Sequence, residues 1–246
     1  FFGTMIGGVN GVNGVYGFLM NNLYLFTCLI YVITGSVILL WYYFAFAEPA
    51  GVPRFVNAQT RRLSPSCFVW LFILSFAVEH VVSLLMTLIN VIAPSAIEEY
   101  TELVETAGVT EYSPVWVIGT LILPPLVEEI IFRGLILGYL RKAGACFIVA
   151  NLIQAVLFGV YHMNLVQGIY AAALGFLLGY LVWRYESLIA PMVVHALFNF
   201  FGTVIVELES NILPELFFGM IIIGCVPLLV LALVMIHWGI GGKKRG

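Results

Sequence analysis

Repeated long apolar stretches constrain the fold of this chain more than any other feature. Runs of 18 or more mostly apolar residues follow one another, separated by short polar segments. The chain is 62% hydrophobic and only 9% charged, unlike soluble globular domains. Backbone groups in lipid must be satisfied within the spanning structure, and runs of this length suit helices. The sequence therefore predicts an all-α, polytopic transmembrane helix bundle.

The apolar runs predict about seven spans. We place them at Asn22–Phe46, Cys67–Ile92, Pro114–Leu140, Ala145–His162, Leu165–Tyr185, Leu188–Val206 and Leu216–Trp238. The predicted organisation has four parts: a Gly- and Asn-rich lead-in (1–21), N-terminal spans with an acidic loop (22–113), a core (114–206), and a last span with a basic tail (207–246). The acidic segments Pro94–Tyr112 and Glu207–Glu215 are expected to be loops.

The lysines and arginines predict the orientation of these spans. Nine of the ten fall after the first, third, fifth and last spans, which places them on one side of the membrane. Basic residues gather on the cytoplasmic side of membrane proteins. We therefore expect a multi-pass integral membrane protein with its C-terminus in the cytoplasm.

The tenth basic residue lies inside the third span, together with two carboxylates. Glu128, Glu129 and Arg133 would all sit near the middle of the membrane, where charges are costly and as a rule mark function. Glu129 and Arg133 are one helical turn apart and can pair. Glu128 is then left without a local partner. Pro124-Pro125, one turn earlier, predicts either a packing kink or a widened cavity beside Glu128.

Further polar residues lie in the other spans. Span four ends with Phe158 and His162, and span six contains His195 and Asn199, each pair one turn apart. Polar groups in lipid are expected to face one another, so these should converge with Glu128. A base, imidazoles and an amide are the groups that hydrolysis of a peptide bond requires. Taken singly, each histidine or asparagine would more often be a hydrogen bond between helices.

Glu79 and His80 form another polar pair, in the middle of span two. The simpler interpretation is an interhelical pair within the bundle. The alternative is a supporting contact, either to Arg133 or to the wall of the cavity.

Three motifs together make a family resemblance. E-E-I-I-F-R (Glu128–Arg133), F-G-V-Y-H (Phe158–His162) and H-A-L-F-N (His195–Asn199) resemble, in order, the EExxxR, FxxxH and HxxxN motifs of the CAAX-protease and bacteriocin-processing family, which includes the type II CAAX prenyl endopeptidase. The resemblance covers about Pro114 to Phe201. The short chain looks more like the prokaryotic members of the family, which implies a prokaryotic cell membrane.

The resemblance implies an endopeptidase of the glutamic type. Glu128 would activate water with help from His162, and His195 and Asn199 would stabilise the oxyanion. Glu129 and Arg133 would orient the site or contact substrate. It implies no cofactor and no metal, and a substrate that is a membrane-embedded or lipidated protein or peptide. No basic stripe suggests a nucleic-acid partner.

Three alternatives remain at this point. The protein could be a non-proteolytic membrane partner or immunity protein of the same family. Two histidines and two glutamates could bind zinc, although the helical HExxH motif is missing. Buried glutamate, histidine and arginine also form proton relays in transporters, but the chain has no detectable internal repeat.

Overall fold

The computed structural model describes residues 14, 17–18, 22–106 and 112–239, and this part of the chain contains helices and no strand. Within these described residues, six helices are long and apolar enough to cross a membrane: Leu23–Ala50, Pro65–Ile92, Pro114–Lys142, Leu165–Tyr185, Ile189–Ile212 and Glu215–Gly239. The predicted all-α polytopic bundle is confirmed, and the chain is a multi-pass integral membrane protein. The predicted lead-in over 1–21 lies almost entirely outside the described residues.

The fourth predicted span is shorter than expected. It forms α10 (Phe147–Tyr161), a helix of 15 residues. At 1.5 Å per residue such a helix is about 22 Å long, less than the ~30 Å of a hydrocarbon core. The extra residues predicted at each end lie outside the helix, and His162 follows its last turn.

The other elements keep to the predicted order. They are α2 (Leu23–Tyr42), η1 (Tyr43–Ala47), α3 (Glu48–Ala50), α4 (Val52–Thr60), α5 (Pro65–Ile92), α6 (Pro94–Thr106), α7 (Pro114–Trp116), η2 (Val117–Ile122), α8 (Leu123–Glu129), η3 (Ile130–Ile136), α9 (Leu137–Lys142), α11 (Leu165–Tyr185), α12 (Ile189–Phe200), η4 (Phe201–Ile205), α13 (Val206–Ile212) and α14 (Glu215–Gly239), where η marks a π-helix.

The polar connections differ from the expected loops. The acidic segment after α5 is helical over Pro94–Thr106, and the one after η4 is helical over Val206–Ile212. Glutamate is a good helix former, and α6 begins with Pro94, a residue that suits the first turn of a helix. High polarity distinguished these segments from spans, but it did not exclude short helices.

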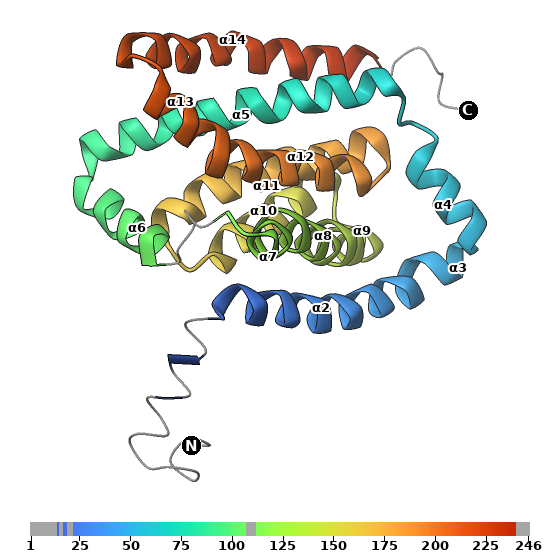
Figure 1. The fold of residues 1–246 in the computed structure, drawn as a ribbon. Coiled ribbons are helices and arrows are strands. Elements are labelled where there is room, and N and C mark those ends of the chain that lie inside the picture. The colour runs from blue at the N-terminus through green and yellow to red at the C-terminus, as the bar shows by residue number, and fades with distance from the viewer. Residues whose placement is uncertain (1–13, 15–16, 19–21, 107–111, 240–246) are drawn as a thin grey trace.

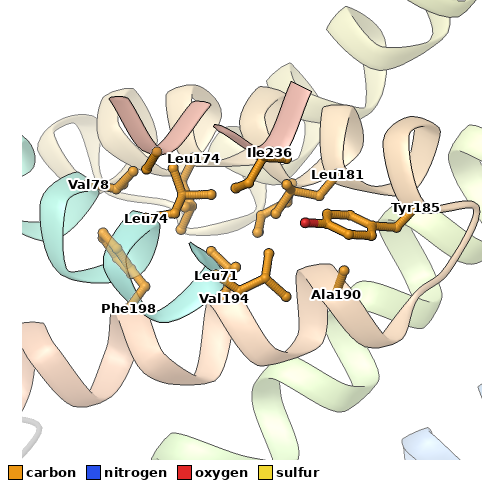
Figure 2. Packing of buried hydrophobic residues seen from close by; sticks show 12 residues of the cluster. Leu71, Leu74, Val78, Leu174, Leu181, Tyr185, Ala190, Val194, Phe198 and Ile236 are labelled. Carbon is orange, nitrogen blue, oxygen red and sulfur yellow. The ribbon is translucent and has the colours of Figure 1, made fainter. Parts of the chain in front are cut away.

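The apolar core lies between four of the long helices. Figure 2 shows it: α5, α11, α12 and α14 contribute the buried side chains of Leu71, Leu181, Val194 and Ile236 among others. In Figure 1, α14 lies along α5 at one edge of the bundle and α2 lies at the opposite edge. Helix α2 buries no residue in the protein, so most of its apolar surface faces outward.

Helices α10 and α11 approach each other closely at glycines. A Cβ atom placed on Gly159 would lie 2.5 Å from the carbonyl oxygen of Gly168, which is too close for any side chain. Small residues at such crossings let membrane helices come into backbone contact. This crossing directly follows Phe158, and so it fixes where that ring lies.

The third membrane helix is continuous from Pro114 to Lys142 but contains two π-helical stretches, η2 and η3. Pro124 and Pro125 lie in the first turn of α8, after Leu123, and have no N–H group. Wide π turns are frequent at functional sites. Here the polar sequence from Glu128 to Arg133 runs from α8 into η3.

The charged residues in the connections and at the ends of the spans divide between the two ends of the bundle. At one end Arg61 and Arg62 both pair with Glu186, Lys142 donates to the carbonyl of Ala45 at 2.7 Å, and Arg184 donates to the carbonyl of His237. The opposite end carries α6 and α13, with their glutamates. Figure 1 shows α4 at the first end and α6 at the other.

Candidate active site

A cavity of about 780 Å³ lies inside the bundle, towards the end that carries α6. Of the predicted site residues it is lined by Glu128, His162, His195 and Asn199, which come from α8, the end of α10 and α12. Glu79 from α5 lines it too, and so does Pro124. Glu129, Arg133, Phe158 and His80 do not line it. Polar residues from separate spans therefore share one cavity.

Glu128 is buried and presents both carboxylate oxygens to polar groups. Its Oε1 accepts a hydrogen bond of 2.9 Å from the hydroxyl of Tyr31 on α2. Its Oε2 lies 3.8 Å from Nε2 of His195, which is too long for a direct hydrogen bond. One water molecule in the cavity could contact both of these atoms. Glu128 is thus free to act on a molecule in the cavity.

Glu129 lies behind the cavity and pairs with two cationic or potentially cationic groups. Its Oε1 accepts from Nη1 of Arg133 at 2.8 Å, as the spacing predicted, and from Nδ1 of His195 at 2.8 Å. A carboxylate oxygen only accepts, so Nδ1 of His195 carries hydrogen. This contact turns Nε2 of His195 towards Glu128 and the cavity.

The ring of Phe158 connects the polar groups. The Arg133 guanidinium lies 4.3 Å from its centroid, a cation–π distance. The imidazoles of His162 and His195 meet the same ring edge-on, at centroid distances of 4.8 and 5.6 Å. Arg133 is fully enclosed, and its Nε and Nη2 have no hydrogen-bond acceptor among the described residues. Phe158 thus fixes one guanidinium and two imidazoles by packing.

His162 is held by its own helix. Its Nδ1 donates to the carbonyl oxygen of Phe158 at 2.8 Å. In the neutral imidazole this leaves Nε2 as an acceptor, and the half-buried ring lines the cavity. His162 therefore offers a proton acceptor on the same cavity as Glu128.

Asn199 donates a hydrogen bond to a backbone carbonyl that receives none from within the third membrane helix. Its Nδ2 donates to the oxygen of Thr120 at 3.4 Å, a long hydrogen bond. The residues four and five positions after Thr120, which would donate in an α- or a π-helix, are Pro124 and Pro125, and neither has an N–H. The side-chain amide has a second N–H, and Asn199 also lines the cavity.

Of the two interpretations of this pair, His80 fits the contact between helices and Glu79 fits the contact with the cavity wall. His80 is fully buried and bridges helices: Nδ1 donates to the carbonyl of Phe76 and Nε2 lies 2.8 Å from Oε2 of Glu209 on α13. Glu79 faces the other way, onto the cavity, and contacts neither Arg133 nor His80 in any hydrogen bond or ion pair found among the described residues.

Sequence reasoning missed two tyrosines. Tyr31 on α2 bonds Glu128, and Tyr161 at the end of α10 lines the cavity. A tyrosine within an apolar span carries no charge and fits packing equally well, so the pattern gave no signal for Tyr31. Tyr161 directly precedes His162 inside the F-G-V-Y-H motif, and that position was the available signal.

Comparison with known proteins agrees with the motifs. Residues 110–201 match the family model described as type II CAAX prenyl endopeptidase Rce1-like. This segment is therefore similar to the Rce1-like endopeptidases. The resemblance predicted from the three motifs is confirmed over this range, which contains Glu128, Glu129, Arg133, Phe158, His162, His195 and Asn199.

A curated relative points the same way. The chain is 36% identical over 96 residues to a Bacillus subtilis (strain 168) protein named "Putative membrane peptidase YdiL". The alignment covers 39% of this chain and 38% of that relative, so the chain spans well under half the length of the protein it matches. No solved structure matches the chain.

Proposed function

We propose that this protein is an intramembrane endopeptidase in which Glu128 activates water to hydrolyse a peptide bond of a membrane-associated protein or peptide. The observation that carries the proposal is the shared cavity: Glu128, His162, His195 and Asn199 all line it. The Rce1-like match and the name of the Bacillus relative support proteolysis as the reaction class. No covalent acyl-enzyme is required.

The reaction begins with a water molecule between Glu128 and the substrate carbonyl. Glu128 accepts a proton from this water while the oxygen adds to the carbonyl carbon. The hydrogen bond from Tyr31 fixes one oxygen of Glu128 and leaves Oε2 facing the cavity. His162, with Nε2 as acceptor, holds the second hydrogen of the water or receives a proton from it.

The tetrahedral intermediate carries its negative charge on the former carbonyl oxygen. The free N–H of Asn199 and an Nε2–H of His195 donate to this oxyanion. For this role His195 is an imidazolium, because its Nδ1 hydrogen is already committed to Glu129. Together with Arg133 this cation balances the charges of Glu128 and Glu129, which makes the buried set neutral.

Collapse of the intermediate breaks the C–N bond. The electron pair leaves with the amine nitrogen, which takes the proton that Glu128 received from the water. The remaining hydroxyl proton of the new carboxyl group passes through His162 to the amine, so that the fragments leave as a carboxylate and an ammonium group. Glu129, Arg133 and Phe158 are positioning residues in this scheme. They touch the imidazoles and each other, not the reacting atoms.

The membrane setting limits the substrate. The cavity lies within a bundle of spanning helices, so a membrane-embedded or lipidated protein or peptide reaches it most directly. We place the protein in a prokaryotic cell membrane with the basic end of the bundle, and the C-terminus, in the cytoplasm. The cavity then lies towards the opposite face.

The arrangement of possible metal-ligating side chains does not favour metal-assisted hydrolysis. Within the described residues no three His, Cys, Asp or Glu side chains are arranged to hold a metal ion. In the metal-independent scheme, exhaustive chelation followed by assay leaves the cleavage rate unchanged. Loss of cleavage that added zinc restores would replace Glu128 with a metal-bound water as the nucleophile.

The test uses the native membrane. Peptide termini are compared between cells that express the wild type and cells that express Glu128→Gln, with equal amounts of inserted protein. New termini that depend on Glu128 identify the substrates. Identical termini in both strains, together with a cellular phenotype that the variant still supports, would favour the non-proteolytic membrane partner instead.

A further inference from the structure

The catalytic scheme does not use a buried carboxylate that lies in the same cavity. Glu79 is only 7% exposed, lines the cavity wall, and its Oε2 has no hydrogen-bond partner among the described residues. Removal of an unpaired charge from water is costly unless a cation or several donors meet it. The partner that Glu79 lacks within the protein can come from what enters the cavity.

The lining of the cavity favours a cation as that partner. Glu128 and Glu207 line it with Glu79, and no lysine or arginine of the described residues does so. Glu128 and Glu207 each already accept a tyrosine hydroxyl, from Tyr31 and Tyr112. Glu79 is the carboxylate of this set without such a donor. Against these three carboxylates the lining has one cation, the His195 imidazolium of the proposed scheme, so the cavity keeps a net negative charge and concentrates cations.

Aromatic rings add a second feature that suits a cation. Tyr100, Tyr170 and Phe198 line the same cavity; the two tyrosine hydroxyls are 3.0 Å apart, and the rings of Tyr170 and Phe198 are in contact. Burial raises the pKa of Tyr100, the hydrogen bond with Tyr170 opposes this shift, and the Glu79 carboxylate adds to it, so the hydroxyl lies within the field of that carboxylate. Guanidinium and ammonium groups bind aromatic faces as well as carboxylates.

The helix that carries His195 and Asn199 gives the distance between Glu79 and the scissile bond. Glu79 meets this helix at Gly202, where an added Cβ would lie 2.8 Å from its Oε1. Gly202 is seven residues after His195, which is about 10 Å along a helix. An extended peptide advances about 3.3 Å per residue. A peptide that runs along this helix with its scissile bond at His195 therefore reaches Glu79 about three residues from that bond.

We propose that Glu79 selects substrates with a lysine or arginine within about three residues of the scissile bond. Glu79 binds the cationic side chain, and Tyr100, Tyr170 and Phe198 surround it. This inference rests on the proposed endopeptidase activity and names the substrate class of the same cavity. Gly202 supports it sterically, because any side chain at this position would displace the carboxylate.

The experiment compares three model peptides in lipid nanodiscs that contain the full chain. Each has the same apolar segment and carries lysine, glutamine or glutamate at one position three residues from the bond that the protein cuts. For the wild type we expect kcat/KM for the lysine peptide to exceed that for the glutamine peptide by about tenfold or more, as close charge pairs allow. The lysine-to-glutamine ratio is the readout, because a merely structural defect lowers both rates.

Substitutions at position 79 should then change the ratio in a defined direction. Glu79→Gln brings it close to one, and Glu79→Lys shifts the preference to the glutamate peptide. Glu209→Gln is the matched control: Glu209 bonds His80 outside the cavity lining, and its substitution leaves the ratio at the wild-type value. An unchanged ratio in Glu79→Gln, or no preference in the wild type, overturns the proposal.

A measurement of peptide binding tests this inference separately from the proposed reaction. Glu128→Gln retains Glu79, so it should bind the lysine peptide more tightly than the glutamine peptide, by fluorescence anisotropy, whether or not the wild type cleaves either. Failure of cleavage with a preserved binding preference would reject the endopeptidase and keep the cation site. If Glu128→Gln binds the two peptides equally, and Glu128→Gln/Glu79→Gln gives the same result, the cation site is rejected.

Discussion

The hydroxyl of Tyr31 donates a hydrogen bond of 2.9 Å to Oε1 of Glu128, although the two residues lie 97 positions apart in the chain. The bond joins α2, which buries no residue of its own, to the centre of the polar cluster. Hydrogen bonds to charged groups contribute about 1.5–3 kcal/mol. Tyr31→Phe should therefore lower kcat by about tenfold to a hundredfold, with little change in the melting temperature, because the ring stays. An unaltered kcat would show that Glu128 needs no help from α2.

Asn199 has two separable roles, one for each N–H. Asn199→Ala removes the donor to Thr120 and the proposed oxyanion donor, and should lower both the melting temperature and kcat, the latter by about 10²–10³. Pro124→Ala restores a backbone N–H that Thr120 can use. In the double variant we expect the melting temperature to recover while kcat stays low. Recovery of kcat as well would limit Asn199 to a structural role.

Arg133 and Glu129 form a buried pair that should be costly to break from one side. Loss of one partner of such a pair typically costs about 3–5 kcal/mol, because the other is left charged and buried. Arg133→Met should strongly lower the melting temperature in detergent, whereas Arg133→Met/Glu129→Gln should recover most of that loss. The double variant should still be inactive, since His195 loses its carboxylate. Additive losses of stability would mean that the two residues do not interact.

The end of the bundle that carries α6 should face away from the cytoplasm. In a variant without native cysteines, Glu98→Cys on α6 should react with a membrane-impermeant maleimide in intact cells. Thr60→Cys, an exposed position at the end of α4, should react only after the cells are opened. The reverse pattern would place the cavity towards the cytoplasm and would leave the catalytic chemistry untouched.

Much of this arrangement followed from the sequence, for one physical reason. Polar groups in lipid must find one another, so the positions of Glu128, His162, His195 and Asn199 within apolar spans were enough to predict that they converge. The Glu129–Arg133 pair followed from helical spacing alone. The roles of these residues in catalysis remain predictions.

Other features had no signal that a single sequence could give. Nothing in an apolar span distinguishes Tyr31 from a packing residue, and the partner of His80 lies 129 positions away on a segment expected to be a loop. Proline predicted a disturbed helix near Glu128, but not that Asn199 would serve the carbonyl left free. Such contacts depend on which helix faces which, and hydropathy does not encode that.

The most direct test of the account is the cleavage rate of Glu128→Gln in lipid nanodiscs. The amide keeps the size of the side chain and can still accept from Tyr31, but it cannot take a proton from water. This variant should have the melting temperature of the wild type and bind the same amount of peptide, but it should cleave that peptide at least about a thousandfold more slowly. A rate within a few-fold of the wild type would contradict the account, because the water would then be activated by some other group.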